Sequence, residues 1–492
     1  MSQMTQLTQR DRLTRPSERE LADQAFSRAA GARLIEGNCV TLLKDAQENY
    51  PAWLKAIHAA KHYIHFESYI IHEDDSGWMF ADALTAKARE GVRVRVLYDW
   101  MGGFGKTSRS FWNHLRAAGV DVRCYNAPRF DSPVGWLSRD HRKTLTVDGQ
   151  IGFVTGLCVG RMWVGVPEKK IEPWRDTGVE VRGPAVADIE RAFAQVWVLT
   201  GEAISEDEVV VRESLPQMGE IAVRVVASEP ATAGMMRLDQ LVAALARERL
   251  WLTDAYYAAT SSYVQSLRAA ARDGVDVRLL VPNGTDIPIL RPLSRAGYRP
   301  LLEAGVRVFE WNGTMLHAKT AVADSKWGRV GSTNLNVASW FGNLELDVVI
   351  EDEAFARQMD QMYLKDLENA TEIVLDTHRK VRAPNEPEHP NPLLTSGGGS
   401  AGRAAAGAVR ISNTIGAAFT NRRVLEPVES RIMLIAGTLL AALTILFAWF
   451  PRVLVYPLVV VLGWIALALL YRGYKLSRRK NPQEPDASNY RR

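Results

Sequence analysis

The sequence predicts an α/β protein made of two similar halves, and three observations indicate it. A histidine, a lysine two positions later and an aspartate five positions beyond the lysine occur together twice, beginning at His141 and at His317. Short Val-rich segments alternate with longer helical stretches in the same order in both halves. A glycine precedes equivalent Val-rich segments, as at Gly91 and Gly274. An internal repeat of alternating strands and helices indicates one α/β lobe per half.

The elements of each half follow one order. Each predicted strand is a short apolar run, and a glycine before it is typical of a helix C-cap that leads into a sheet. A helix closes each half after the repeated motif. The predicted strands are 63–69, 91–97 and 119–125 in the first half and 250–254, 274–280 and 305–309 in the second, and the closing helices are 185–197 and about 354–370.

Composition divides the chain into six parts. A polar N-terminal segment precedes the two repeats, and a Pro-rich and then Gly-rich stretch after them is typical of a linker. The end of this stretch mixes apolar residues with arginines and could lie on a membrane surface. The predicted parts are 1–31, the repeats 32–205 and 206–380, the linker and surface segment 381–430, an apolar hairpin 431–472 and a basic tail 473–492.

Two uncharged runs predict a transmembrane hairpin at the C-terminal end. Residues 432–450 and 453–471 carry no charge, and at about 1.5 Å per residue each run can cross a hydrocarbon core of roughly 30 Å. Pro451-Arg452 between them leaves room only for a tight turn. Basic residues flank both outer ends, which favours the cytoplasm for them. We therefore expect a cytoplasmic catalytic region at the cell (inner) membrane. Two helices buried in a soluble core are the alternative.

Charge and cysteine usage narrow the class of protein. The net charge is +4, but residues 472–492 hold seven basic and two acidic side chains, so the remainder sums to −1. A near-neutral catalytic region argues against nucleic acid as a partner, because phosphate neutralisation supplies most of that affinity. Cys39, Cys124 and Cys158 lack the spacing of metal ligands and suit a reducing compartment.

The repeated residues suit chemistry on a phosphodiester. Residues two apart on a strand face the same side, so His141 and Lys143 can enter one cleft, as can His317 and Lys319. If the halves associate about a pseudo-twofold axis, both pairs meet in one shared active site. One neutral imidazole would attack phosphorus while the other protonates the leaving alcohol. The lysines would neutralise the non-bridging oxygens, so no metal or other cofactor is expected.

A nucleophilic histidine needs an acceptor on its other ring nitrogen. Asp148 and Asp324 are candidates for catalytic residues by their place in the motif, although they could instead support the turn that follows it. Asp176 and Glu345 are the alternative orienting carboxylates.

Other polar residues near the motifs are candidates for the site. In Gly331-Ser-Thr-Asn, Ser332 and Asn334 could donate hydrogen bonds to a phosphate, and Gly331 would allow close backbone approach. Glu67 and Asp99, at predicted strand ends, suit a functional and a structural role equally. The stretch 162–174 could contact lipid headgroups or form a plain exposed loop.

These segments resemble the phospholipase D superfamily, with its paired HxKxxxxD motifs, and within it the bacterial cardiolipin synthase branch. The resemblance covers about residues 32–378. It rests on Phe66-Glu-Ser-Tyr69, Tyr98-Asp99 with Gly102-Gly103, His141 to Asp148, Trp174-Arg-Asp-Thr177, His317 to Asp324 and Gly331-Ser-Thr-Asn334. It implies two α/β/α lobes, one shared active site and metal-independent transfer through a phosphatidyl-histidine. It also implies His141 as nucleophile and His317 as acid, with Glu345 and Asp176 as orienting residues.

The resemblance implies a phosphatidyltransferase whose partners are glycerophospholipids, such as phosphatidylglycerol, and the membrane. Hydrolytic phospholipase D and phosphatidylserine synthesis are the nearest alternatives, and a nuclease of the same superfamily or a non-catalytic scaffold are the other classes. The chain departs from the family at Cys158, where an asparagine is expected, and at Asn336 to Ser339, where aspartate and arginine are common. These departures concern the substrate more than the reaction. The sequence does not indicate an oligomeric state.

Overall fold

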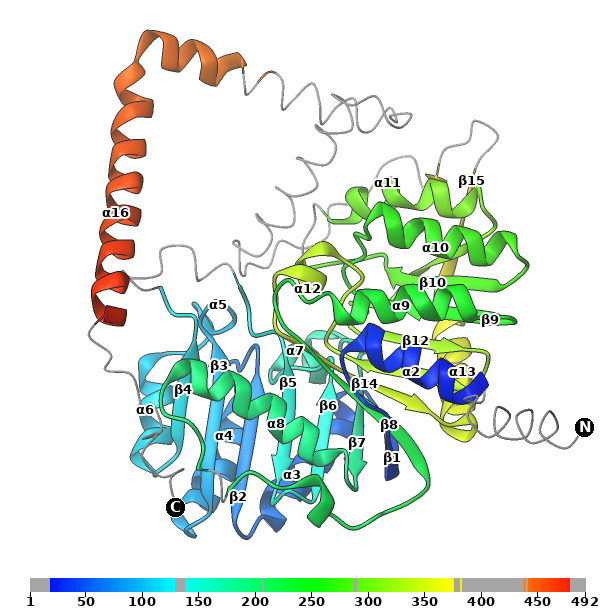
Figure 1. Ribbon diagram of the computed structural model, residues 1–492, viewed down its shortest axis with the longest axis horizontal. Coiled ribbons are helices and arrows are strands. Elements are labelled where there is room, and N and C mark those ends of the chain that lie inside the picture. The colour runs from blue at the N-terminus through cyan, green and yellow to red at the C-terminus, as the bar shows by residue number, and fades with distance from the viewer. Residues whose placement is uncertain are drawn as a thin grey trace, which may run out of the picture. The chain divides into compact units, whose positions relative to one another are not determined.

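A computed structural model describes residues 18–128, 138–205, 208–286, 290–375, 381–382, 438 and 441–477. The chain divides into two compact units, one within residues 1–125 and 138–409 and the other within 126–137 and 410–492. The first unit contains both repeated motifs. It is an α/β structure, as the sequence predicts (Figure 1).

The described strands of the first unit form one mixed sheet in the order β16-β15-β11-β10-β9-β12-β13-β14-β8-β1-β7-β6-β5-β2-β3-β4. The first half supplies β1 (Ile35–Lys44), β2 (Tyr63–Ser68), β3 (Arg93–Asp99), β4 (Asp121–Tyr125), β5 (Lys143–Val147), β6 (Ile151–Thr155) and β7 (Thr177–Arg182). The second half supplies β8 (Ile221–Ser228), β9 (Arg249–Thr253), β10 (Asp276–Pro282), β11 (Arg307–Trp311), β12 (Thr320–Ala323), β13 (Trp327–Gly331), β14 (Glu345–Glu351), β15 (Ala370–Leu375) and β16 (Val381–Arg382).

The strand order shows that the two halves are equivalent. From the centre outward the first half runs β1-β7-β6-β5-β2-β3-β4, and the second runs β8-β14-β13-β12-β9-β10-β11. The equivalent strands β1 and β8 pair antiparallel where the halves join. An antiparallel contact between equivalent strands is the arrangement that a pseudo-twofold axis produces.

Four of the predicted strands begin two residues later than expected. Gly91, Gly119, Gly274 and Gly305 all have positive φ, between +90° and +94°. Each therefore ends the preceding helix in the left-handed conformation, and the strand starts only after the chain has turned.

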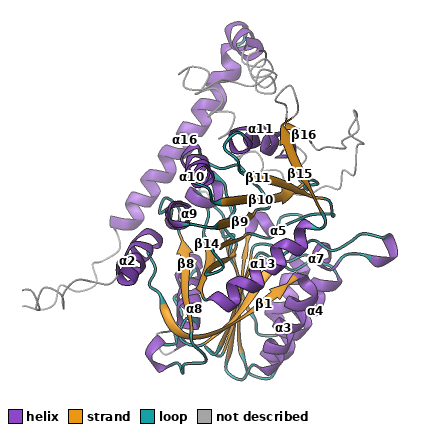
Figure 2. Ribbon diagram, turned by 90° about the vertical axis from the view of Figure 1, so that its right-hand side faces the viewer, coloured by secondary structure: helices purple, strands orange, loops and turns teal. Residues whose placement is uncertain are grey.

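Helices cover both faces of each half-sheet (Figures 1 and 2). Alternate residues of β2 show this directly, because Phe66 stacks on Phe80 of one helix layer while His65 stacks on Phe193 of the other. The layers are α3 (Asp45–Ala59), α4 (Asp75–Arg89) and α6 (Arg109–Ala117) against α8 (Val186–Trp197) in the first half, and α9 (Gly234–Leu245), α10 (Ser261–Arg272) and α11 (Leu290–Leu302) against α13 (Glu353–Leu367) in the second. The closing helices α8 and α13 agree with the prediction within three residues at each end.

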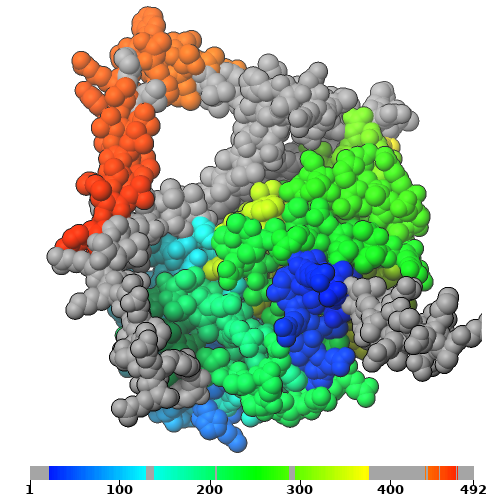
Figure 3. Space-filling view, in the orientation of Figure 1, coloured from blue at the N-terminus to red at the C-terminus, as the bar shows by residue number. Residues whose placement is uncertain are grey.

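The halves are packed across their junction as well as paired along it. Helix α8 of the first half contacts β8, and α13 of the second half contacts β1. Helix α2 (Glu18–Ala30), which precedes the first repeat, lies against α9 of the second half (Figure 3). Its Asp23 accepts a hydrogen bond from the buried Arg224 of β8 at 2.8 Å. Three short helices, α5 (Trp100–Gly103), α7 (Arg161–Val164) and α12 (Val337–Phe341), follow strand ends.

In the second unit, residues 441–449 are helical and α16 (Pro451–Ser477) follows after a break at Phe450. Pro451 and Arg452, where the sequence predicts a tight turn, belong to the first turn of α16, and the break lies one residue earlier. Within the described ranges, no helix combines the length and the apolarity needed to cross a membrane. Residues 432–437 and 439–440 of the first predicted span lie outside those ranges, and so do residues 383–430 of the linker.

Candidate active site

The two motifs lie where the halves cross. His141 and Lys143 stand at the start of β5, and His317 and Lys319 stand immediately before β12. The backbone N–H of His141 donates to the carbonyl oxygen of Leu344 at 2.9 Å, and that of His317 donates to Arg175 at 2.7 Å. Each motif is thus held by a segment of the opposite half.

All four motif side chains are buried and within electrostatic reach of one another. The charge of Lys319 acts on His141, and that of Lys143 acts on His317. The ammonium group of each lysine donates to the carbonyl oxygen of the histidine two residues before it. The expected shared site is therefore present in the geometry, with two imidazoles and two ammonium groups.

Each histidine contacts a carboxylate of the opposite half. Nδ1 of His141 lies 2.9 Å from Oε2 of Glu345, and Nδ1 of His317 lies 2.7 Å from Oδ2 of Asp176. Nδ1 must donate to an ionised carboxylate, which fixes the tautomer and leaves Nε2 free to face a substrate. Of the two sets of candidate orienting residues, the geometry selects Asp176 and Glu345.

Asp148 and Asp324, the candidates from the motif itself, bind backbone N–H groups. Asp148 accepts hydrogen bonds from the backbone N–H groups of Lys61, His62 and Tyr63, each at 2.8 Å. Asp324 accepts the equivalent three from Arg247, Glu248 and Arg249, at 2.8 to 2.9 Å. In the described part of the chain neither aspartate contacts a motif histidine. Each aspartate fixes the loop that enters β2 or β9, which is the turn-supporting role that the sequence left open.

Ser332 also departs from its expected role. Its hydroxyl donates to Oε2 of Glu345 at 2.5 Å, and its oxygen accepts the backbone N–H of Leu346 at 3.0 Å. The single hydroxyl proton is therefore committed to the orienting carboxylate and is not free for a phosphate. Gly331 allows a close approach to Asp347, whose Cα would lie 2.5 Å from an added Cβ, and not to a ligand.

Asn334 stays a candidate for phosphate binding. Its side chain is buried, and among the described residues Oδ1 has no hydrogen-bond partner. Its amide group can therefore rotate to serve a bound phosphate. In the first half, Cys158 stands at the equivalent position, since each residue lies 17 positions after its motif histidine. Burial raises the pKa of the Cys158 thiol. The first half thus has a neutral thiol where the second has an amide.

Burial sets the charge of the resting site. It lowers the pKa of both imidazoles, and that of His317 falls to about 3 with the help of Lys319. It lowers the pKa of Lys319 to about 8, together with the charge of Lys143. Burial opposes ionisation of Asp176 and Glu345, but the neighbouring histidines and lysines outweigh it and hold both pKa values below normal. These pKa shifts favour neutral imidazoles beside ionised carboxylates.

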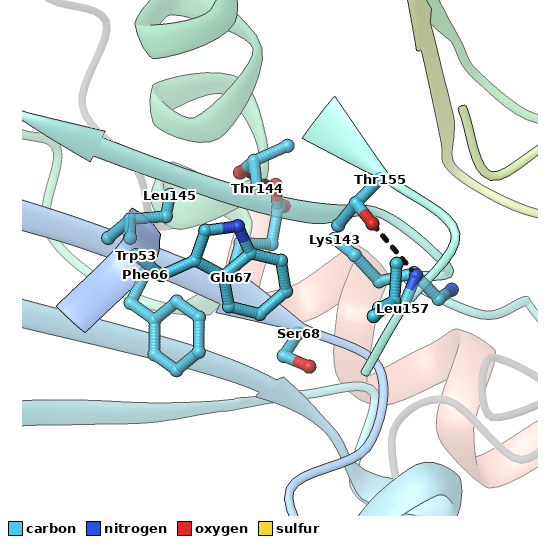
Figure 4. Close-up of a pocket in the computed structure, with 9 residues that line it drawn as sticks. All are labelled: Trp53, Phe66, Glu67, Ser68, Lys143, Thr144, Leu145, Thr155 and Leu157. Atoms are coloured by element: carbon cyan, nitrogen blue, oxygen red, sulfur yellow. Dashed lines mark hydrogen bonds between the residues drawn. The ribbon is translucent and has the colours of Figure 1, made fainter. Parts of the chain in front are cut away.

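Glu67 and Asp99 have structural contacts. Asp99 accepts the backbone N–H of Asp140 at 2.9 Å and caps α5 through Met101 at 2.8 Å. Glu67 accepts the hydroxyl of Thr144 at 2.9 Å. These carboxylates hold the residues on either side of His141. Glu67 also lines a narrow pocket with Lys143, and neither histidine lines it (Figure 4).

Sequence reasoning missed the aromatic residues around the motifs. The ring of Tyr69 lies 5.0 Å from that of His141, and the ring of Tyr256 lies 5.8 Å from that of His317. Each tyrosine also faces its motif lysine, with Nζ at 5.3 Å from Tyr69 and 5.7 Å from Tyr256. The signal was present, since Tyr69 ends the predicted strand 63–69 and Tyr256 lies two residues after the predicted strand 250–254. No group of His, Cys, Asp and Glu side chains within the described ranges could hold a metal ion.

The duplicated lobes and the crossed histidine–carboxylate pairs define a protein of the phospholipase D-like class. The chain matches a family model described as "Cardiolipin synthase, PLD-like domain" over residues 53–197 and 242–367. This match covers more than half of the chain, and the chain belongs to that family.

Individual relatives agree. A cardiolipin synthase of Alkalihalophilus pseudofirmus is 33% identical over 68% of this chain and 66% of its own length. Cardiolipin synthase A of Pseudomonas fluorescens is 34% identical over 71% of this chain and 72% of its own length. The chain thus spans slightly less than two thirds of the first of these relatives. The crystal structure of phosphatidylserine synthase from Haemophilus influenzae has a TM-score of 0.58 at 13% identity, covers 72% of this chain and 92% of that chain, and shows the fold alone.

Proposed function

We propose that this chain is a cardiolipin synthase-type phosphatidyltransferase, which moves a phosphatidyl group from one glycerophospholipid to a hydroxyl of another. The observation that carries the proposal is the crossed pairing of His141 with Glu345 and His317 with Asp176. It provides two oriented imidazoles, each with Nε2 directed away from its carboxylate. Reversible transfer at phosphorus needs one imidazole as nucleophile and the other as acid and base.

The first half-reaction follows from this arrangement. The anionic phosphodiester binds between Lys143 and Lys319, and its charge favours the protonated form of His317, which Asp176 stabilises. Nε2 of His141 forms a bond to phosphorus, the bond to the headgroup oxygen breaks, and His317 gives its proton to that oxygen. The products are a phosphatidyl-histidine and a free alcohol. The lysines stabilise charge that develops on the non-bridging oxygens.

The second half-reaction reverses these steps with a new alcohol. The acceptor hydroxyl of a second lipid loses its proton to His317 as its oxygen bonds to phosphorus, and the bond between phosphorus and His141 breaks. The assignment of His141 as nucleophile rests on the family resemblance, because the geometry treats the two histidines alike. Phosphatidylglycerol, which offers both a phosphodiester and a primary hydroxyl, is the proposed substrate on both sides.

Mass spectrometry of lipid products tests the proposal. The full chain is incubated with phosphatidylglycerol vesicles beside His141→Ala, His317→Ala and, as a matched control, His58→Ala, whose side chain is exposed. We expect cardiolipin and free glycerol from the parent chain and from His58→Ala, and neither product from the two motif variants. Phosphatidic acid alone would indicate a hydrolase, and cleavage of DNA with no lipid turnover would indicate a nuclease.

Acid-quenched reactions separate the two histidines. Labelled phosphatidylglycerol should leave a covalent phosphatidyl adduct on the protein. A second donor carries an activated headgroup that leaves without a proton. With this donor, the variant that retains the nucleophile but lacks the acid should accumulate the adduct. We expect this from His317→Ala and no adduct from His141→Ala.

We further propose that the C-terminal apolar segments hold the protein at the cytoplasmic face of the cell (inner) membrane. Large apolar side chains of α16 are exposed, among them Val460 (69%) and Leu467 (58%). Exposed apolar surface of this extent is typical of contact with a membrane or partner. The basic residues that flank residues 431–472 support the orientation.

Vesicle flotation of the full chain at high salt tests this placement. We expect the chain to float with phospholipid vesicles and the double variant Val460→Asp with Leu467→Asp to remain unbound. Leu199→Asp is the matched control, because Leu199 is equally exposed (62%) but belongs to the first unit. Equal binding by the double variant and the control would contradict the proposal.

A further inference from the structure

The two halves of the site differ in one segment. Asp176 follows His141 by 35 positions, whereas Glu345 follows His317 by 28, so the first half has seven more residues between motif and carboxylate. Helix α7 begins 20 residues after His141, as α12 begins 20 residues after His317, and the first half then adds a small hairpin in which Val166 and Ile171 pair antiparallel. We call residues 161–174 the inserted segment. Its helix α7 corresponds to α12 of the second half, which leads into β14 after three residues.

The inserted segment is fastened at both ends and to the opposite half. The backbone N–H of Trp174 donates to the carbonyl oxygen of Met162 at 2.9 Å, which closes the segment at its base. The hydroxyl of Thr314, just before the second motif, donates to the carbonyl oxygens of Glu172 at 3.0 Å and Pro173 at 3.1 Å. The segment is therefore part of the wall beside His317.

Trp163 takes the place that the hydroxyl of Ser332 has in the second half. Nε1 of Trp163 donates to Oδ2 of Asp176 at 3.0 Å, the oxygen that also contacts His317. Ser332 makes the equivalent contact to Glu345. At the position equivalent to Ser332 the first half has Gly156, where even a Cβ would lie 2.2 Å from Oδ1 of Asp176. A serine cannot fit there, so the indole orients this carboxylate.

The same segment encloses His317 in aromatic surface. The ring of Trp174 lies 5.5 Å from that of His317, the ring of Trp163 lies 5.6 Å from it, and Tyr256 completes a third side at 5.8 Å. Within the described part of the chain, Tyr69 alone makes the corresponding ring contact to His141, at 5.0 Å. Among the described residues, three rings lie against His317 and one against His141, which makes the described surroundings of His317 the more apolar.

We infer that the inserted segment determines whether the phosphatidyl-histidine is transferred to a lipid hydroxyl or hydrolysed. The inference rests on the proposed function, in which His317 takes the proton of the attacking alcohol. Water can replace that alcohol: its oxygen bonds to phosphorus, the bond to His141 breaks, and its proton goes to His317, which yields phosphatidic acid. An apolar wall at His317 disfavours a lone water molecule and accommodates the carbon chain of a glycerol headgroup.

Trp174 is the specificity-determining residue in this arrangement, because its ring is half-buried and touches His317 without a hydrogen bond to the catalytic groups. Trp163 is a positioning residue, since it acts through Asp176. Their substitutions should differ. Loss of the Trp174 ring should change the ratio of products, whereas loss of the Trp163 N–H should change the rate and its pH dependence.

The experiment measures phosphatidic acid and cardiolipin from phosphatidylglycerol vesicles, with released glycerol as the measure of total turnover. Trp174→Ala and Trp174→Leu are compared with Tyr69→Ala, which removes the ring beside the other histidine. We expect Trp174→Ala to raise the ratio of phosphatidic acid to cardiolipin about tenfold, the usual effect of one apolar contact on discrimination. Trp174→Leu should raise it less, and Tyr69→Ala should lower turnover at an unchanged ratio.

Two outcomes would overturn the inference while leaving the proposed function intact. One is an unchanged product ratio in both Trp174 variants while glycerol is still released. The other is an equal rise in Tyr69→Ala. A parent chain that releases glycerol but makes only phosphatidic acid would instead contradict the proposed transferase itself. Trp163→Phe, which keeps the ring and removes the N–H, should reduce kcat and shift its acidic limb, with the product ratio unchanged.

Discussion

Nδ1 of His317 lies 2.7 Å from Oδ2 of Asp176, although 141 residues separate them in the chain and they belong to opposite lobes. Glu345 makes the same contact to His141 across 204 residues. Neither lobe supplies both a motif histidine and the carboxylate that contacts it. The chemical unit is therefore the pair of lobes, and separation of the lobes removes both oriented histidines at once.

The crossed pairs predict the effect of neutral carboxamides at these positions. In Asp176→Asn and Glu345→Gln the side chain can rotate its NH2 group toward Nδ1, which would stabilise the wrong tautomer. We expect kcat to fall by about 10²–10⁴-fold in each, the range that acid–base catalysis contributes, with little change in KM. Steady-state kinetics with phosphatidylglycerol vesicles measures this.

The control for these variants is Glu168→Gln, an exposed side chain of the inserted segment, which should leave kcat unchanged. Circular dichroism should show native secondary structure in all three variants. A rise in KM with kcat retained would contradict an orienting role. It would place the carboxylates in substrate recognition instead.

The motif aspartates should affect stability and not chemistry. Asp148 and Asp324 each accept three backbone N–H bonds, and asparagine has only one acceptor oxygen. Loss of these charged acceptors should cost roughly 1–3 kcal/mol per site. We expect Asp148→Asn and Asp324→Asn to lower Tm, while kcat of the folded fraction stays near that of the parent chain. A large fall in kcat at unchanged Tm would restore the catalytic interpretation.

These aspartates also show what the sequence can predict and what it cannot. The repeat predicts the α/β lobes, the strand series and the convergence of His141, Lys143, His317 and Lys319, because equivalent residues must occupy equivalent places. It cannot decide between an aspartate seven residues from a histidine and a carboxylate on the other lobe. That choice depends on how the lobes cross, which no local pattern encodes.

Trp163 is a second residue whose role the sequence does not predict. The sequence leaves 162–174 open between a lipid contact and a plain loop. The structure divides the stretch, because Lys169 and Lys170 are exposed at its tip while Trp163 is buried against Asp176. Likewise Ser332 belongs to a predicted phosphate-binding motif but donates to Glu345. Such roles follow from side-chain packing between lobes and become visible only in three dimensions.

Lys319 should set the alkaline limit of activity. Burial, aided by the charge of Lys143, lowers the pKa of Lys319 to about 8. Above this pH the ammonium loses its proton and no longer stabilises the phosphate oxygens. We expect kcat/KM to decline on the alkaline side with an apparent pKa of about 8. Lys326→Gln, at an exposed turn after β12, should show the same profile.

Stability should not follow activity in this range. Between about pH 8 and the ordinary lysine pKa of 10.5, the unfolded chain binds a proton at Lys319 that the folded chain does not. The contribution of this group to the free energy of unfolding therefore rises with pH. Tm measured beside the rates separates the two effects. An alkaline loss of activity that coincides with a fall in Tm would assign the limb to unfolding.

Cysteine labelling tests the proposed orientation at the membrane. Cys39 is exposed, and a cytoplasmic catalytic unit places it where an impermeant maleimide cannot reach it in intact cells. We expect labelling of Cys39 in inverted membrane vesicles only, with Cys39→Ser as the unlabelled control in a Cys124→Ser background. If the C-terminal segment is a hairpin, a cysteine introduced by Ser488→Cys in the basic tail must label from the same side as Cys39. Labelling from opposite sides would require an odd number of crossings, and labelling of Cys39 in intact cells would place the catalytic unit outside the cytoplasm.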